Sequence, residues 1–443
     1  MRRLQILTRT SLLVLAVAAQ ALASDWIVQL KNPAQASTLS QQFLSVVTGI
    51  SPANGVFRIS LPTGPLGDLL SKLLQSSPLL QKIEPDTLLT VPQIGTAYSS
   101  PNVAAPSVTS GAGYLAWTTQ PSNSEIHLSQ AQNKSVGAGV TVAVIDTGVD
   151  STHPNLIGFV DVGPDFSGNN DPAGTLAQET SPMVDQETSP MVDQETSPMV
   201  DAKGTIILDQ ETSPMVDGLG MAFGHGTMVG GLVHLVAPAA HILSIKAFAN
   251  DGTGTLSGIV SALYYAADHG ANVINASWST GVNSSLLQQA IGYALGKGAV
   301  VVAAVANNGA ANVVYPAGLP GVVGVACTTP AGNNSDNRCS FSNYGTDVDL
   351  GAPGSGITST FPIYAVGVNG AIQKVSNGFA MGSGTSFSTP YVSGTAALVK
   401  SRSWSSNVNQ VGNDITGGAV PMPYVPGMGA GRLDANGAVA QAK

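Results

Sequence analysis

A serine toward the C-terminus of this 443-residue chain lies between a glycine-rich loop and an apolar segment. Ser386 follows Gly382 and Gly384, and the run Thr389 to Val399 has a helical pattern. At the N-terminus of a helix, backbone N–H groups lack helical partners and favour developing negative charge. The position therefore suits a nucleophilic hydroxyl, which needs a base and an acid that orients the base.

Two other segments offer such a base and acid. His225 lies between Gly224 and Gly226 at the start of a second helical run, where the missing side chains let other groups approach the imidazole. Asp146 ends the apolar strand before Thr147-Gly148, and ligands bind at the carboxyl ends of parallel strands. Asp150 is a nearby alternative acid. The other histidines are expected to be structural or surface residues: His127, His153, His234, His241 and His269.

The order Asp146, His225, Ser386 and the motifs around these residues resemble the subtilisin-like serine peptidases, the subtilases. The matching motifs are Asp146-Thr147-Gly148, His225-Gly226-Thr227 and Gly384-Thr385-Ser386 with Thr389-Pro390. The resemblance implies that Asp146 orients His225, and that His225 takes the proton from Ser386. It also implies that Asn307, after an apolar strand, donates to the oxyanion with the Ser386 backbone N–H, and Asn308 remains the alternative.

Ser277-Trp278-Ser279 resembles the strand edge on which this family binds extended substrate. The family commonly has glycines where this chain has Ser279 and Thr280, and also where it has Ala306. These larger side chains predict a narrower first specificity pocket.

From residue 137 onward, nearly continuous Val, Ala and Ile strands alternate with helical segments. Strands with apolar side chains on both faces predict an α/β fold, a parallel sheet flanked by helices, and the resemblance to the subtilisin-like fold covers residues 137–443. Strands are expected at 140–145, 240–246, 272–276, 299–306, 321–326 and 347–350, and helices at 256–269 and 286–297.

The segment before residue 137 divides into three predicted parts. Residues 1–23 have the arginines, short apolar run and Ala21-Leu22-Ala23 cleavage site of a signal peptide. Residues 24–95 predict a small α+β domain, with strands at 25–30 and 55–61, helices at 36–47 and 65–74, and an extended piece at 82–91. This domain resembles the inhibitory propeptide of the family. Residues 96–136 are expected to be a linker and a poorly ordered lead-in.

The acidity of the chain is local. The octapeptide Gln-Glu-Thr-Ser-Pro-Met-Val-Asp occurs at 178–185, 186–193, 194–201 and 210–217, and accounts for eight of the nine net negative charges. With few apolar residues and one proline per unit, the insertion 178–217 is predicted to be an exposed loop. No basic patch indicates a nucleic-acid partner.

Cys327 and Cys339 lie twelve residues apart, and in an exported protein they are predicted to form a disulfide. Two free thiols remain the alternative. No metal site or cofactor is predicted. Asn155 occupies a position where the family often has an aspartate ligand for calcium, so calcium binding is left unassigned.

These features predict a secreted serine endopeptidase, extracellular or periplasmic, that cleaves protein or peptide substrates through an acyl-enzyme. Its own propeptide is the expected inhibitor, released between Val91 and Trp117, and no membrane span is expected after signal removal. The alternative is a catalytically impaired member that acts as a peptide-binding or structural module. A lipase or esterase is rejected, because Ser388 occupies the last glycine position of the G-x-S-x-G elbow.

Overall fold

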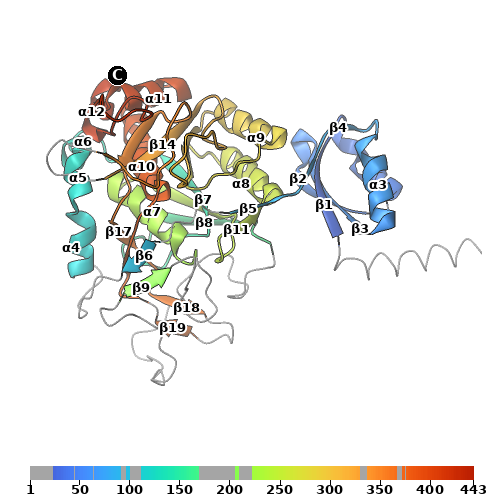
Figure 1. Ribbon diagram of the computed structural model, residues 1–443, viewed down its shortest axis with the longest axis horizontal. Coiled ribbons are helices and arrows are strands. Elements are labelled where there is room, and N and C mark those ends of the chain that lie inside the picture. Colours follow the sequence, from blue (N-terminus) through green and yellow to red (C-terminus); the bar gives the residue numbers. More distant parts are fainter. Residues whose placement is uncertain are drawn as a thin grey trace, which may run out of the picture. The chain divides into compact units, whose positions relative to one another are not determined.

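The computed structural model describes residues 23–43, 45–62, 64–90, 96–99, 111–168, 205–208, 222–329, 337–366, 372–374 and 376–443 (Figure 1). The predicted signal peptide, apart from Ala23, and all four octapeptide copies lie outside these residues. The chain forms two units, which are described separately. The first is Met1–Leu88 with Thr255–Ser261 and Ser284–Leu287, and the second is Leu89–Gly254, Ala262–Asn283 and Gln288–Lys443.

The first unit contains an antiparallel sheet with strand order β2-β3-β1-β4. Its strands are β1 (Ala23–Leu30), β2 (Val46–Ser51), β3 (Val56–Pro62) and β4 (Leu80–Pro85), and its helices are α2 (Ala36–Phe43) and α3 (Pro65–Gln75), with short 3-10 turns at Pro33–Gln35 and Pro52–Asn54. Alternate residues of β3 pack with Leu39 and Leu74 in a separate apolar core.

One helix boundary was predicted wrongly in this unit. The helix expected over 36–47 ends at Phe43, and Val46 and Val47 begin strand β2. Val46, Val47 and Thr48 are β-branched, and such side chains favour a strand over a helix. The unit therefore has one more strand than the sequence predicted.

Two carboxylates of the first unit cap helical turns within it. Asp86 accepts hydrogen bonds from Ser257 N (2.8 Å) and Ser257 Oγ (2.6 Å), at the start of α8 (Leu256–Asp268). Glu84 accepts from Ser285 N at 2.8 Å, at the start of α9 (Ser285–Gly296). A carboxylate at a helix start pairs unsatisfied N–H groups and complements the helix dipole.

The main sheet of the second unit has the order β15-β14-β13-β12-β7-β10-β8, with β16 also paired to β14. The strands are β7 (Thr141–Asp146), β8 (Val160–Asp165), β10 (His241–Lys246), β12 (Val273–Ala276), β13 (Val300–Ala304), β14 (Val322–Thr329), β15 (Asn337–Arg338) and β16 (Leu350–Pro353). The described pairs are parallel except β14 with β15. The predicted parallel sheet is confirmed, although β16 lies a few residues later than expected.

Two long helices pack together beside this sheet and carry the candidate base and nucleophile (Figure 1). They are α7 (His225–Val236) and α10 (Thr385–Arg402), and α10 also contacts β12, β13, β14 and β16. A Cβ atom built on Gly394 of α10 would lie 2.6 Å from the Cβ of Val236. Glycine at this position therefore permits the close approach of the two helices.

The segment before β7 differs from its prediction. Instead of a poorly ordered lead-in, residues 112–132 form α4 (Ala112–Thr118), α5 (Pro121–Glu125) and α6 (Leu128–Gln132). Trp117, Ile126 and Leu128 are buried in the main apolar core. Burial of these few apolar side chains therefore fixes a segment whose overall composition is that of a linker.

The remaining elements are short strands and two C-terminal helices. The strands β17 (Ile357–Thr360), β20 (Phe379–Gly382), β6 (Thr96–Ser99) and β9 (Thr205–Leu208) form one sheet, β5 (Leu88–Thr90) pairs with β11 (Thr253–Thr255), β18 (Tyr364–Val366) pairs with β19 (Ile372–Lys374), and the helices are α11 (Val408–Gly417) and α12 (Ala435–Gln441). Strand β9 lies within the insertion 178–217, which was expected to be a loop throughout. In the described parts of the chain, no helix has the length and apolar character that crossing a bilayer requires.

Candidate active site

Asp146 and His225 form a buried pair. Asp146 is the last residue of β7, and His225 is the first residue of α7. The distance between His225 Nδ1 and Asp146 Oδ1 is 2.7 Å, and Asp146 Oδ1 also accepts from Thr147 N at 2.7 Å. Asp146 is fully buried and His225 is 5 % exposed. An Nδ1–H that donates to the carboxylate leaves Nε2 as the basic nitrogen of the ring.

Glycine explains why the start of α7 lies so close to the end of β7. A Cβ atom on Gly226 would lie 2.0 Å from the carbonyl oxygen of Gly148, so no larger residue fits there. Gly226 N instead donates to Thr147 Oγ1 at 3.0 Å, and Asp150 N donates to Thr227 Oγ1 at 2.9 Å. These bonds cross-link the two motifs recognised in the sequence.

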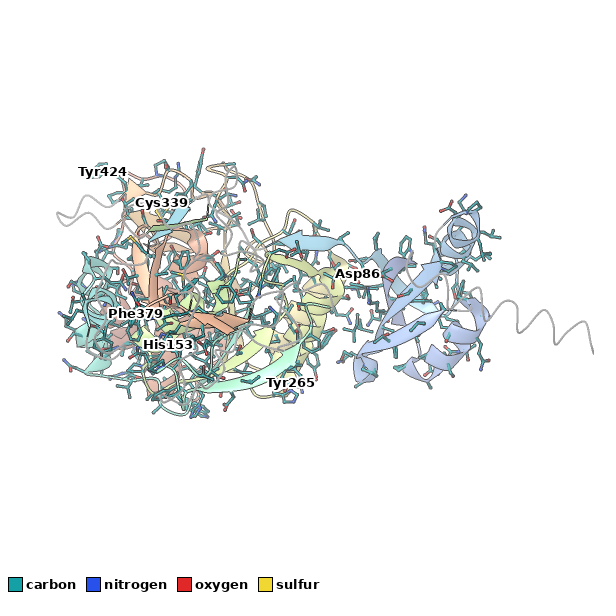
Figure 2. All side chains as sticks on the ribbon, turned by 90° about the horizontal axis from the view of Figure 1, so that it is seen from below. Asp86, His153, Tyr265, Cys339, Phe379 and Tyr424 are labelled. Atoms are coloured by element: carbon teal, nitrogen blue, oxygen red, sulfur yellow. A yellow bond between two sulfur atoms is a disulfide. The ribbon has the colours of Figure 1, made fainter. Side chains whose placement is uncertain are left out.

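The alternative acid and a nearby histidine have other partners. Asp150 Oδ1 accepts from the N–H and hydroxyl of Thr152, and His225 is paired with Asp146 instead. His153 Nε2 lies 2.8 Å from Gly378 O, and its ring meets the Phe379 ring edge-on. Both ring residues are labelled in Figure 2. Burial lowers the pKa of His153, which favours the neutral ring.

Ser386, the second residue of α10, is 1 % exposed. Its Oγ donates to the carbonyl oxygen of Ser277 at 3.0 Å. Within the part of the chain that the structure describes, His225 Nε2 is buried without a hydrogen-bond partner. The ring of Phe387, the next residue, lies 5.6 Å from the His225 ring. The nucleophile candidate is therefore near the acid–base pair, but its hydroxyl is bonded elsewhere.

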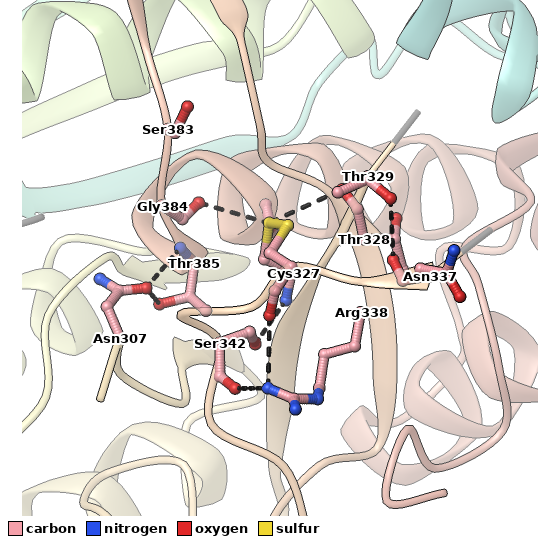
Figure 3. The surroundings of a disulfide bond; sticks show 12 residues. Asn307, Cys327, Thr328, Thr329, Asn337, Arg338, Ser342, Ser383, Gly384 and Thr385 are labelled. Carbon is pink, nitrogen blue, oxygen red and sulfur yellow. Dashed lines mark hydrogen bonds between the residues drawn. A yellow bond between two sulfur atoms is a disulfide. The ribbon is translucent and has the colours of Figure 1, made fainter. Parts of the chain in front are cut away.

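Asn307 lies beside the residue that precedes Ser386 (Figure 3). Its Oδ1 accepts from Thr385 N at 3.0 Å and from Thr385 Oγ1 at 2.9 Å. These bonds fix which end of the amide is oxygen, so Nδ2 is the end that can donate to an oxyanion. The alternative, Asn308, donates its backbone N–H to Asn343 Oδ1 at 2.9 Å, as part of a turn.

The three residues predicted to bind substrate follow β12 and have different surroundings. Ser277 is fully buried and bonded to Ser386. Trp278 is also fully buried, with its ring 6.0 Å from that of Phe248, so it is an interior residue. Ser279 is only partly buried. Of these three side chains, Ser279 is the one that can meet a ligand at the surface.

A disulfide joins Cys327 and Cys339, with 5.4 Å between their Cα atoms (Figure 3). A Cβ atom on Gly354 would lie 2.9 Å from Cys327 Sγ, and the carbonyl of Gly354 accepts from Gly384 N at 2.7 Å. The disulfide therefore lies next to the loop that leads into α10.

Asn155 N donates to His153 Nδ1. Among the described residues, no group of three or more His, Cys, Asp or Glu is able to hold a metal.

Sequence reasoning missed one buried residue that supports the site. Lys246 ends β10, is 1 % exposed, and donates to Thr147 O at 2.8 Å and to Asn250 Oδ1 at 3.1 Å. It therefore holds the turn after Asp146. The signal available in the sequence was a lysine directly after the mostly apolar strand segment Ile242 to Ile245, because lysine is seldom fully buried unless its charge is paired.

The fold, the Asp146–His225 pair and the serine at the start of α10 together define a subtilisin-like serine peptidase. The subtilase family model matches residues 137–413, and the chain belongs to this family of serine-type endopeptidases.

Individual relatives are similar over much of the chain. Thermitase from Thermoactinomyces vulgaris is 34% identical over 293 residues, which are 64% of this chain and 82% of thermitase. The thermophilic serine proteinase of Bacillus sp. (strain AK1) is 31% identical, over 85% of this chain and 77% of that protein. The crystal structure of fervidolysin from Fervidobacterium pennivorans has a TM-score of 0.66 at 21% identity, over 94% of this chain and 61% of the fervidolysin chain, which is a likeness in fold.

Proposed function

We propose that the chain is a secreted endopeptidase that hydrolyses peptide bonds through a triad of Asp146, His225 and Ser386. The observation that carries this proposal is the buried 2.7 Å bond from His225 Nδ1 to Asp146, beside the helix that begins with Thr385 and Ser386. A carboxylate that holds one ring nitrogen orients the other as a general base and stabilises the imidazolium that forms.

In the proposed reaction, Ser386 Oγ attacks the scissile carbonyl carbon while His225 Nε2 takes its proton. His225 then gives this proton to the leaving amine, and an acyl-enzyme remains. Water attacks the ester, loses its proton to His225, and releases the acid as the proton returns to Ser386. The Ser386 hydroxyl must first rotate away from Ser277 O, and the N–H of an extended peptide that pairs with Ser277 O would take its place.

Two donors are proposed for the oxyanion, Asn307 Nδ2 and the Ser386 backbone N–H. The contacts of Thr385 with Asn307 Oδ1 support this orientation of the amide. Preorganised donors in a buried site stabilise the charge that develops on the carbonyl oxygen. The proposed chemistry needs no cofactor, and calcium remains unassigned.

We also propose that the block 24–95 is an inhibitory propeptide of an exported precursor. The capping bonds of Glu84 and Asp86 with the helical turns in the first unit support a role for this block in binding those turns. The N-terminus of the mature protein is expected between Val91 and Gly111, because α4 begins at Ala112 and buries Trp117. A mature N-terminus before Val91 or after Gly111, found by sequencing secreted protein, would contradict this boundary.

The test of the triad is Ser386→Ala, which should lower kcat by about 10⁶-fold. Ser401→Ala is the matched control, because the Ser401 hydroxyl is on the same helix but near its other end, where it donates to the carbonyl of Ala138. Both proteins should be assayed on a casein substrate and labelled with a fluorophosphonate. Labelling of wild type and Ser401→Ala but not of Ser386→Ala is expected. Both proteins are labelled after removal of block 24–95, and an unlabelled processed wild type would favour the alternative, a catalytically impaired peptide-binding module.

A further inference from the structure

A chain of buried hydrogen bonds leads to the backbone of Ser386 from residues outside the proposed triad. Ser393 Oγ donates to Asn275 Oδ1 at 2.8 Å, Asn275 Nδ2 donates to Ser277 Oγ at 2.9 Å, and Ser277 Oγ donates to the Ser386 carbonyl at 2.8 Å. Asn275, Ser277 and Ser393 are all fully buried. This series of hydrogen bonds starts and ends on α10 and passes through the residues at the end of β12.

The polarity of this chain follows from its last member. A carbonyl oxygen can only accept, so the Ser277 hydroxyl must donate to Ser386. Its oxygen must then accept, which requires the NH₂ end of the Asn275 amide. The oxygen end of that amide faces Ser393, whose hydroxyl therefore donates. Each group thus has one orientation, and each bond polarises the next.

The carbonyl of Ser386 is available because of a proline. In an α-helix this oxygen would accept from the N–H of the residue four positions later, which is residue 390. Residue 390 is a proline inside α10 and has no N–H. The Ser277 hydroxyl supplies the missing donor. Because Ser386 Oγ in turn donates to Ser277 O, the two residues are joined by two reciprocal bonds.

We propose that Ser393 and Asn275 are positioning residues that act through Ser277 on the backbone of Ser386. This inference rests on the proposed function. The Ser386 backbone determines where its Oγ and its N–H lie, and these are the proposed nucleophile and the second oxyanion donor. Misplacement of a nucleophile lowers the rate of the chemical step more than it weakens substrate binding.

The first test is Ser393→Ala, with Thr395→Val as the matched control. The Thr395 hydroxyl is on the same helix and fully buried, but it donates to the Tyr391 carbonyl of that helix. We expect Ser393→Ala to lower kcat about tenfold with KM within about twofold, and Thr395→Val to keep both constants. The rate of fluorophosphonate labelling should fall in parallel with kcat. Ser393→Thr, which keeps the donor, should restore both rates.

The second test is a double-mutant cycle on kcat. Because Ser393 and Asn275 act through one chain, the variant with Ser393→Ala and Asn275→Ala should lose no more than the worse single variant. Additive losses would overturn the proposal, as would a kcat of Ser393→Ala equal to that of Thr395→Val. A processed wild-type protein that does not react with the fluorophosphonate would instead refute the proposed function. Labelling of wild type and Ser393→Ala at equal rates would refute only the positioning role.

Discussion

The acid–base half of the proposed site and its nucleophile half are held in different ways. Asp146 and His225 are joined side chain to side chain at 2.7 Å, and this pair is complete at rest. Ser386 and Asn307 are held mainly through Ser277 and Thr385, and the Ser386 hydroxyl is bonded to a carbonyl rather than to His225. One half is therefore ready to act, whereas the other still needs a rotation of one side chain.

The difference shows where substrate binding can contribute to the reaction. In the proposed reaction, preorganisation of the Asp146–His225 pair avoids a reorganisation cost during proton transfer. In the nucleophile half, the backbone is fixed while the hydroxyl can change partners. A peptide that occupies Ser277 O would therefore complete the site as it binds.

Asp146→Asn should have the largest of these effects, with a loss of about 10⁴-fold in kcat. An amide that donates to His225 Nδ1 leaves the proton on Nε2, where it blocks the general base. The matched control is Asp161→Asn, because Asp161 faces His241 at 3.7 Å in an exposed pair. A loss within about tenfold for Asp146→Asn, in kinetics on a peptide substrate, would show that the acid–base half is not built as described.

Asn307→Ala should lower kcat by about 10²- to 10³-fold with little change in KM, because its Nδ2 donor acts on the charge that develops on the substrate oxygen. Asn308→Ala is the control, since its backbone N–H keeps its bond to Asn343. A greater loss for Asn308→Ala would transfer the oxyanion role to that residue.

His234, near the other end of α7 from His225, should make the fold sensitive to acid. Burial lowers the pKa of His234 to about 4, and its ring lies 4.4 Å from that of Phe159. His234 binds a proton more readily in the unfolded chain than in the folded one. The free energy of unfolding is therefore highest above about pH 6.5, and it falls by on the order of 2–3 kcal/mol as the pH falls toward 4.

The measurement is thermal unfolding against pH. His234→Leu should flatten the decline in Tm between pH 6.5 and 4, whereas His241→Gln, at an exposed position, should keep it. An unchanged decline in His234→Leu would assign the acid sensitivity to other groups.

Ala306→Gly should have the smallest effect, and it concerns the backbone before Asn307. Ala306 has a φ of 73°, in the left-handed region that costs a non-glycine residue roughly 1–2 kcal/mol. Removing its Cβ should therefore stabilise the fold by about 1 kcal/mol. Ala304→Gly, within β13, should destabilise it, because glycine weakens a strand. Denaturant unfolding compares the free energies of unfolding of the two variants. A loss of stability in Ala306→Gly would show that the backbone at Ala306 is not strained.

Most of the main sheet could be predicted because its strands are apolar on both faces, and runs of Val, Ala and Ile have few other stable arrangements. The helices α4 to α6 could not, because Trp117, Ile126 and Leu128 lie in a segment whose composition resembles a linker. The strand β2 was missed because Val46 and Val47 follow a helical pattern directly. In the prediction, the helical periodicity of the preceding residues counted for more than these β-branched side chains.

The sequence alone shows which residues can do the chemistry, because an acid after an apolar strand, a histidine between two glycines and a serine at a helix start are local patterns. The tertiary structure alone decided the partners: His225 with Asp146 rather than Asp150, Asn307 with Thr385, and Trp278 in the interior. It also decided that Ser277, more than 100 residues before Ser386, supplies the donor that Pro390 removes from the helix. Hydrogen bonds between distant segments depend on how strands and helices pack, and no local pattern encodes that packing.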